Sequence, residues 1–240
     1  MALDALFFGA HPDDVELTSG GLAALLAAHG HGVGVVDLTR GEAASRGTVE
    51  ERARESEEAA RALGIARRLN LRLPDLGLDA RDRSQQVALV ECLRSERPRL
   101  VVAPEAEDVH PDHVEASRLV ARACYLAGLA RFQAGGERFR PGRLLFALYR
   151  SMRRPHLVVD ITSVWSRRLQ ALRAHQSQLG SGPGPATYLT RPEFVEEVES
   201  RARGFGAAIG VRYGEGYRSP VPFLVEDARV LLPGSTREPA

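Results

Sequence analysis

The stretch LDALFFGAHPDDVELTSGGLAALLAAHGHGVGVVDL, residues 3–38, contains two short apolar runs on either side of a segment with helical spacing. The runs Leu3–Gly9 and Gly32–Leu38 are rich in residues that favour strands. Between them, Ser19–Gly30 places three leucines on one face of a helix. We therefore expect a strand, a helix and a second, parallel strand, which is the βαβ unit of open α/β sheets.

The same alternation continues along the chain. Thr48 followed three residues later by Glu51 is typical of a capping box, which predicts a helix to about Leu63. The run RLVVA at 99–103 is almost continuously apolar, as in a parallel strand buried on both faces. We also expect strands over 68–73, 144–149 and 157–161, and helices over 84–97, 112–129, 164–176 and 192–209. This pattern predicts a doubly wound α/β fold with a mostly parallel sheet and helices on both faces.

Length and charge indicate a globular chain without a strongly charged partner. The 240 residues, 44% of them hydrophobic, can bury a substantial core. We expect one domain over 1–240, with a mobile loop near 180–187 and a flexible tail after 233. A net charge of +1 gives no reason to expect nucleic acid or a membrane as partner, and no apolar run is long enough to span a bilayer. Cys92 and Cys124 lack metal-site spacing, so buried thiols and a cytoplasmic location are expected.

Two charged segments follow predicted strands. AHPDDVE, residues 10–16, comes directly after the first strand, and EAEDVHPDHVE, residues 105–115, comes after the RLVVA strand. The carboxyl ends of parallel strands meet at one edge of the sheet, where ligands bind. We therefore expect the two segments to meet in space, about a hundred residues apart in sequence.

Two histidines and a carboxylate form a usual ligand set for a catalytic zinc ion, and His11, His113 and Asp14 can supply it. The same donor set also suits iron or manganese. Asp13 is then placed to accept a proton from metal-bound water, and His110 to donate to the developing oxyanion while Asp112 fixes its tautomer. Each motif alone also fits a turn or a helix cap, so the prediction depends on the two occurring together.

Several sequence blocks resemble those of the PIG-L/LmbE-type zinc N-deacetylases. The blocks are AHPDDVELTSGG, TRGEAASRGTVEERARESEEAARALG and HPDHVEASRL, and the resemblance extends from Leu3 to about Pro222. Two further blocks, HQSQLG and ESRARGFGAAIGVRYGEGY, resemble the branch that deacetylates N-acetylglucosaminyl malate in bacillithiol biosynthesis.

The resemblance implies a Rossmann-like fold, a zinc cofactor, a small amino-sugar conjugate as substrate and a homo-oligomer, commonly a hexamer. It assigns the same roles to the residues above: His11, Asp14 and His113 bind zinc, Asp13 is the base, and His110 is the acid or electrostatic residue, partnered by Asp112. It also places Arg52 near the substrate. Val109 is a departure, because relatives often carry a basic residue before HPDH.

Other polar residues have open assignments. Tyr188 either leans over the substrate or packs a loop, and Glu16 either orients a ligand or begins a helix. Arg46 and Arg143 are candidates for a substrate carboxylate, although each also fits an ordinary surface role. His175 and Gln178 share a helical face that either approaches the pocket or is structural.

Three alternative functions remain at this stage. One is a deacetylase of another glucosaminyl conjugate, carrying inositol or a second sugar. Another is a dinucleotide-dependent oxidoreductase, which the absence of GxGxxG after the first strand disfavours. The third is a metal-stabilised binding protein without catalysis.

Overall fold

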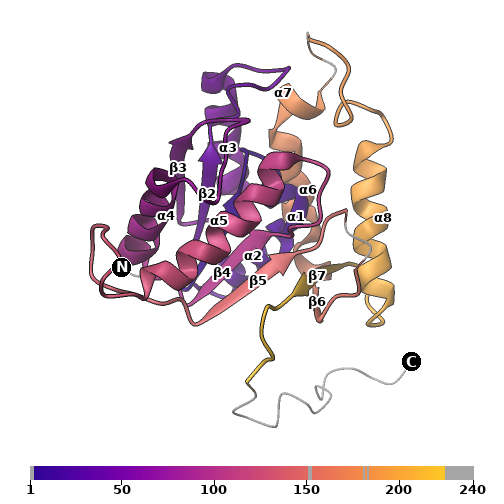
Figure 1. Ribbon diagram of the computed structural model, residues 1–240. Coiled ribbons are helices and arrows are strands. Elements are labelled where there is room, and N and C mark those ends of the chain that lie inside the picture. Colours follow the sequence, from indigo (N-terminus) through magenta and orange to yellow (C-terminus); the bar gives the residue numbers. More distant parts are fainter. Residues whose placement is uncertain (1–2, 151–152, 181, 183, 225–240) are drawn as a thin grey trace.

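The apolar runs of the sequence form one seven-stranded sheet in the computed structural model, which describes residues 3–150, 153–180, 182 and 184–224 (Figure 1). The strand order is β3-β2-β1-β4-β5-β7-β6. The strands are β1 (Ala5–Gly9), β2 (Val33–Thr39), β3 (Arg67–Leu73), β4 (Leu100–Pro104), β5 (Arg143–Ala147), β6 (Leu157–Asp160) and β7 (Gly214–Arg218). Strands β1 to β5 pair in parallel, whereas β7 runs antiparallel to both β5 and β6. The predicted mostly parallel α/β sheet is confirmed.

Helices cover both faces of this sheet (Figure 1). They are α1 (Asp14–Thr18), α2 (Gly20–Ala28), α3 (Val49–Leu63), α4 (Arg83–Glu96), α5 (Pro111–Ala127), α6 (Trp165–Ala174), α7 (Gln176–Leu179) and α8 (Phe194–Ala207). Helices α4 and α5 pack together over one face, α2, α3 and α6 pack together on the other, and α8 lies against β7. Strands β1 and β2 are buried along their whole length, as expected for strands with helices on both sides.

Local sequence signals explain where the helices begin and end. The Thr48 hydroxyl accepts the Glu51 N–H at 3.1 Å, and the Glu51 carboxylate accepts the Thr48 N–H at 2.8 Å. This confirms the predicted capping box of α3, which ends at Gly64 in the left-handed region. Cys92 and Cys124 are free and buried, as predicted.

The amino end of α2 is capped from a distant strand. The buried carboxylate of Glu215 on β7 accepts the backbone N–H groups of Gly21 and Leu22, both at 2.8 Å. A negative charge there satisfies free helix N–H groups and complements the helix dipole. Strand β7, which the sequence pattern did not predict, therefore ties the carboxyl-terminal half of the chain to the first βαβ unit.

The chain reverses its direction across the sheet at the connection from β3 to β4. Chain order runs from β1 outward through β2 to β3, and then returns to β4 on the other side of β1. A crevice forms where the order reverses, at the carboxyl ends of β1 and β4. Both predicted motifs follow these two strands.

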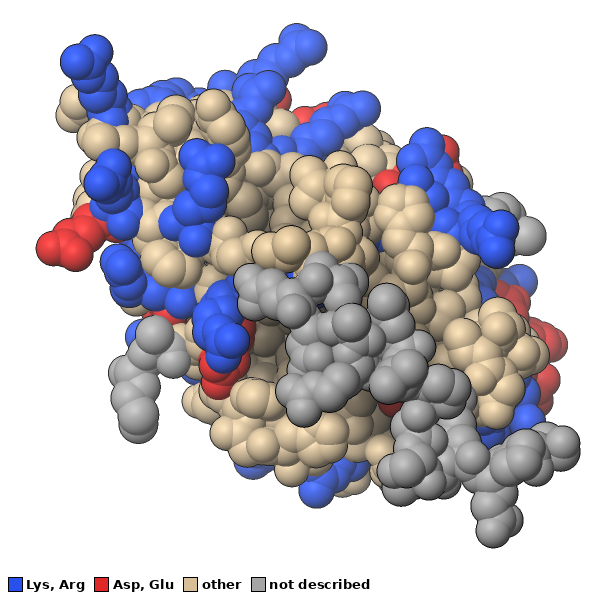
Figure 2. All heavy atoms as spheres, turned by 90° about the horizontal axis from the view of Figure 1, so that it is seen from below, with Lys and Arg blue, Asp and Glu red and all other residues tan. Residues whose placement is uncertain are grey.

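The surface at the opposite end of the strands carries dispersed charge. Figure 2 shows arginine side chains spread around this face with acidic ones between them, and all the basic side chains are arginine because the sequence has no lysine. Within the described residues, none of the helices combines the length and the apolar character needed to cross a membrane. The predicted tail after 233 lies outside the described residues, as do residues 181 and 183 of the predicted mobile loop.

Candidate metal centre

The loops after β1 and β4 meet at the carboxyl edge of the sheet, as predicted. The ring centroid of His11 lies 4.8 Å from that of His110 and 5.4 Å from that of His113. The rings of His110 and His113 stack at 4.7 Å. One nitrogen of each of these three rings lies within 4.8 Å of the other two, a spacing at which a single ion can be shared.

Asp14 lies between the two histidines predicted as ligands. Its Oδ1 is 3.2 Å from Nε2 of His113, and its Oδ2 is 3.6 Å from Nδ1 of His11. The His11 backbone N–H also donates to Oδ2 at 2.8 Å, which fixes the carboxylate. Burial acts to raise the pKa of Asp14, but His113 and His11 outweigh it and hold the pKa well below its usual range.

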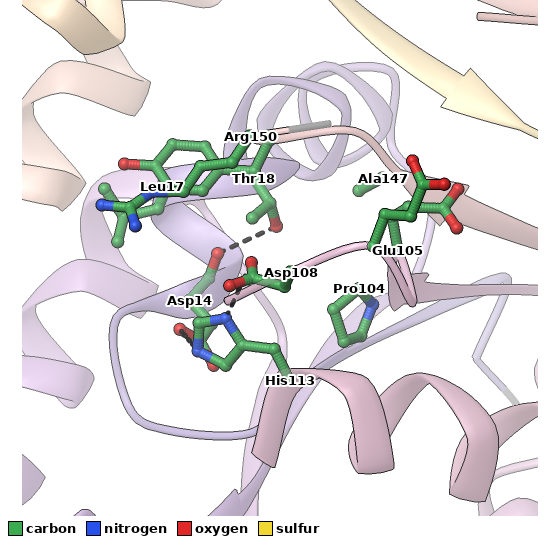
Figure 3. A pocket seen from close by; sticks show the side chains of 11 residues that line it. Asp14, Leu17, Thr18, Pro104, Glu105, Asp108, His113, Ala147 and Arg150 are labelled. Atoms are coloured by element: carbon green, nitrogen blue, oxygen red, sulfur yellow. Dashed lines mark hydrogen bonds and ion pairs between the residues drawn. The ribbon is translucent and has the colours of Figure 1, made fainter. Parts of the chain in front are cut away.

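Two aspartates absent from the predicted site orient these imidazoles. Asp108 Oδ2 lies 3.0 Å from Nδ1 of His113 (Figure 3), whereas Asp14 faces the other ring nitrogen, Nε2. Asp75 Oδ1 lies 3.1 Å from Nε2 of His11. A carboxylate on the second ring nitrogen fixes the tautomer and raises the basicity of a metal-binding histidine. Asp108 could have been inferred from its place two residues before HPDH, whereas Asp75, after β3, carries no such signal.

The negative charge of the site calls for a cation. Five aspartates surround the imidazoles: Asp13, Asp14, Asp75, Asp108 and Asp112. Burial acts to lower the pKa values of His11 and His113, but the surrounding carboxylates raise them to about 12 and about 10. Two imidazolium ions or one divalent cation can offset part of this charge, and two imidazoles with one carboxylate are a donor set that zinc accepts. His11, Asp75 and Asp112 form a second cluster of possible ligands that shares His11 with the first.

Asp13, the predicted base, has a strained backbone. Its φ of 124° and ψ of −23° lie outside the regions that non-glycine residues favour, at a cost on the order of 1–3 kcal/mol. The side chain is buried and lines the pocket beside Asp14. Burial raises the pKa of Asp13, and Arg52, 3.6 Å away, opposes that rise. Backbone strain of this kind is concentrated at functional positions, where it fixes the direction of a side chain.

His110 has its tautomer set by a backbone group. Its Nδ1 accepts the Asp112 N–H at 3.2 Å, so the proton of the neutral ring is on Nε2. Burial, together with His113 and His11, lowers the pKa of His110 and favours this neutral ring. The carboxylate of Asp112 was expected to set the tautomer, but it lies 3.4 Å from His11 Nε2 and accepts the Leu76 N–H at 2.7 Å. Asp112 therefore acts on His110 through its main chain.

A pocket of about 560 Å³ opens above these residues. This volume is typical of sites for small ligands. Arg52 and Tyr188, predicted to bind substrate, both line it. Arg52 donates to the carbonyls of Pro12 at 2.7 Å and Gly41 at 3.2 Å, and a side chain at Gly41 (φ 67°) would collide with its guanidinium. The Tyr188 hydroxyl donates to Glu197, so Tyr188 presents its ring to the pocket.

Residues 6–124 match the family model described as PIG-L, GlcNAc-PI de-N-acetylase. A 1D-myo-inositol 2-acetamido-2-deoxy-alpha-D-glucopyranoside deacetylase of Mycobacterium leprae is 30% identical over 275 residues, covering 83% of this chain and 89% of that one. The chain belongs to the PIG-L family. This membership confirms the family predicted from the HPDD and HPDH motifs and the prediction of an enzyme.

Further relatives extend the PIG-L comparison over most of the chain. Diacetylchitobiose deacetylase of Thermococcus kodakarensis is 29% identical over 220 residues, covering 87% of this chain and 79% of that one. A 4-oxalmesaconate hydratase of Pseudomonas putida is 28% identical over 250 residues, covering 93% and 91%. The crystal structure of the conserved protein TT1542 of Thermus thermophilus matches with a TM-score of 0.85 at 41% identity, covering 93% and 97%. These relatives do not single out the bacillithiol branch.

Of the open candidates in this PIG-L chain, Arg46 and Gln178 form the wall of the pocket. Arg46 donates to four backbone carbonyls at 2.7–3.1 Å, those of Ser177, Gly180, Gly182 and Pro185. Gln178 in turn donates to the Arg46 carbonyl at 2.8 Å. Arg143, by contrast, begins β5 at the opposite edge of the sheet, with its guanidinium over Phe223, so it does not reach the site.

Glu16 and His175 belong to a buried polar network beneath the site. Glu16 is fully buried, with Oε1 2.6 Å from Arg68 and Oε2 3.5 Å from Nε2 of His175. Arg68 also makes a bidentate pair with Asp37 at 2.8 and 2.9 Å. Burial acts to raise the pKa of Glu16, but Arg68 and His175 lower it to about 2. His175 is therefore a core residue beside α1 and is not among those lining the pocket.

Proposed function

We propose that this protein is a metal-dependent N-deacetylase that removes acetate from the N-acetylglucosamine moiety of N-acetylglucosaminyl malate, a step of bacillithiol biosynthesis. The observation that carries the proposal is the meeting of the β1 and β4 loops around Asp14, beside the strained and buried Asp13. The N-acetylglucosaminyl substrate class follows from the deacetylases among the relatives. The assignment of malate as the aglycone rests on the resemblance of the HQSQLG block and of the carboxyl-terminal block that ends in β7.

His11, Asp14 and His113 would hold the metal ion, and zinc fits this donor set. When bound, the ion would polarise the acetamide carbonyl and lower the pKa of a water molecule. Asp13 is placed to take the proton from that water and to return a proton to the departing amine. The Nε2–H of His110 donates to the oxyanion that forms at the carbonyl. Acetate and the free amino sugar are the products.

Arg52 holds the reacting side chains in place. It links the Pro12 carbonyl to Gly41 and faces Asp13, so it fixes the HPDD loop and balances the charge of the base. The Tyr188 ring lies in the wall beside the sugar conjugate, with the guanidinium groups of Arg150 and Arg191 4.1 and 4.2 Å from its centroid. The hexameric assembly implied by the family resemblance and the cytoplasmic location expected from the two free cysteines belong to the same proposal.

The test is acetate release by purified, zinc-loaded protein from four substrates at equal concentration. These are N-acetylglucosaminyl malate, N-acetylglucosaminyl inositol, diacetylchitobiose and free N-acetylglucosamine. The expected result is the highest kcat/KM for the malate conjugate. Preference for the inositol conjugate or for chitobiose would replace the malate assignment while keeping the deacetylase, and bound zinc with no acetate from any substrate would refute the activity.

The hydratase relative supplies a second candidate. A metal-activated water beside a base can also add to a carbon–carbon double bond, and this chain is 28% identical to the hydratase across 93% of its length. Loss of the ultraviolet absorbance of an unsaturated oxo-acid, without acetate release from any amide, would favour hydration.

A further inference from the structure

Three arginines line the pocket: Arg46, Arg52 and Arg150. The first two are engaged by the protein itself. Arg46 donates to four carbonyls of the wall, and Arg52 donates to two carbonyls of the floor and faces Asp13. Their positive charges are therefore committed to backbone oxygens and to the base.

Arg150 lies beyond the end of β5 and has no such partner among the described residues. Its guanidinium stacks 4.1 Å from the centroid of the Tyr188 ring and 5.9 Å from that of Tyr149. In Figure 3 it lies across the cavity from His113, with Asp14 and Asp108 between them. A guanidinium stacked on aromatic rings keeps its five N–H groups free to donate in the plane of the stack.

The acidic groups around Arg150 are paired elsewhere. Glu105 and Glu107 line a smaller cavity next to the pocket, which Arg150 also lines, but Glu107 forms an ion pair with Arg153, and Glu105 lies 3.9 Å from Arg218. Asp108 is bound to His113. Arg150 thus remains available to a ligand although several carboxylates are near it.

An anionic ligand needs such a group to enter this pocket. The aspartates that line the pocket, Asp13, Asp14, Asp75 and Asp108, repel a carboxylate or a phosphate, and a metal ion there is occupied by the reacting amide. A guanidinium at the rim offers a planar, bidentate pair to either anion. Val109, which also lines the pocket, is 79% exposed and uncharged, so it provides no competing cation.

We propose that Arg150 is the specificity-determining residue of the pocket and that it recognises an anionic substituent, a carboxylate or a phosphate, on the aglycone of the amino-sugar substrate. This inference rests on the proposed deacetylase function. The Tyr188 and Tyr149 rings orient the guanidinium, and the anion lies on the rim while the acetamide reaches the floor. Conjugates with a neutral aglycone gain no binding affinity from the Arg150 guanidinium.

The experiment compares Arg150→Gln, Arg150→Lys and the wild type with three substrates. N-acetylglucosaminyl malate carries carboxylates, N-acetylglucosamine 1-phosphate carries a phosphate, and methyl N-acetylglucosaminide is neutral. Arg140→Gln is the control, because Arg140 also stacks on a tyrosine, Tyr125 at 4.7 Å, but does not line the pocket. Each protein is loaded with zinc, and its metal content is measured before kinetics.

Arg150→Gln is expected to raise KM for the preferred anionic substrate about tenfold or more, with kcat and the KM for the neutral substrate unchanged. Arg150→Lys should restore part of the loss, since a point charge replaces a bidentate pair. Whichever anion shows the larger effect identifies the substituent. Equal changes for charged and neutral substrates, or no change for either anion, would overturn the role of Arg150 while acetate release still supports the deacetylase. Absence of acetate release by the wild type from every substrate would instead refute the proposed function, and the role of Arg150 with it.

Discussion

Replacing Glu16 by glutamine removes a buried negative charge and keeps the shape of the side chain. The pKa of Glu16 lies at about 2 in the folded protein, against 4.5 as its ordinary value. Between these pH values the unfolded chain binds more protons at this position than the folded chain, so stability rises with pH through this window. The contribution is complete above about pH 4.5 and is lost as the pH falls towards 2.

The size of the effect follows from that difference in pKa. The lowering of the Glu16 pKa from 4.5 to about 2 stabilises the folded protein by about 3 kcal/mol at pH 7 and by about 1 kcal/mol at pH 3. Glu16→Gln, which resembles the protonated carboxyl, should therefore be about 3 kcal/mol less stable than the wild type at pH 7. At pH 3 the difference should shrink to about 1 kcal/mol.

Urea unfolding followed by circular dichroism at both pH values measures these differences. Glu57→Gln is the matched control, because Glu57 lies exposed on α3, and it should change stability by less than about 0.5 kcal/mol at either pH. A difference between wild type and Glu16→Gln that is the same at pH 7 and pH 3 would show that the Arg68 and His175 contacts do not hold the carboxylate ionised.

Three further changes test the site and its wall. Asp13→Asn should keep its zinc and lose about 10²–10⁴-fold in kcat, because it removes the base and no predicted ligand; full turnover would exclude that role. Asp108→Asn should weaken zinc binding about 10–100-fold in a chelator competition, since His113 loses its orienting carboxylate, and unchanged affinity would contradict the contact. Arg46→Gln should speed hydrogen exchange of the backbone at 177–180 and leave the zinc content unchanged. Exchange equal to the wild type would show that the wall does not depend on this guanidinium.

Most of the fold could be predicted because its signals are local. The capping box of α3 and the apolar run of β4 each determine an element within a few residues. Strand β7 was missed because GEGYR has two glycines and a glutamate in five residues. Its glycines serve close packing: a side chain at Gly216 would collide with the Phe205 ring of α8. Contacts of this kind join residues far apart in sequence and leave no periodic pattern.

As with the fold, most of the candidate site could be predicted from the sequence. HPDD and HPDH each follow a strand, so their meeting could be inferred from parallel-sheet topology, and the structure confirms it. Asp75 could not be inferred, because it reaches His11 from the loop after β3 and belongs to no motif. The carboxylate of Asp112 was assigned to the wrong imidazole, since its sequence distance from His110 says nothing of where the carboxylate points.

The two sides of the pocket differ in how they are attached. The floor is built on β1 and β4 in the middle of the sheet, whereas the segment after α6 is suspended from two side chains. Arg46 donates to the carbonyls of Ser177, Gly180, Gly182 and Pro185, and Glu55 accepts the N–H and the hydroxyl of Ser177. Insertions or exchanges in that suspended segment can accumulate during evolution without disturbing the hydrolytic residues, provided that the arginine and its carbonyl acceptors survive. Such a division offers a route by which one ancestral scaffold diversifies its choice of sugar conjugate, and it marks the segment as the place to begin when redesigning that choice.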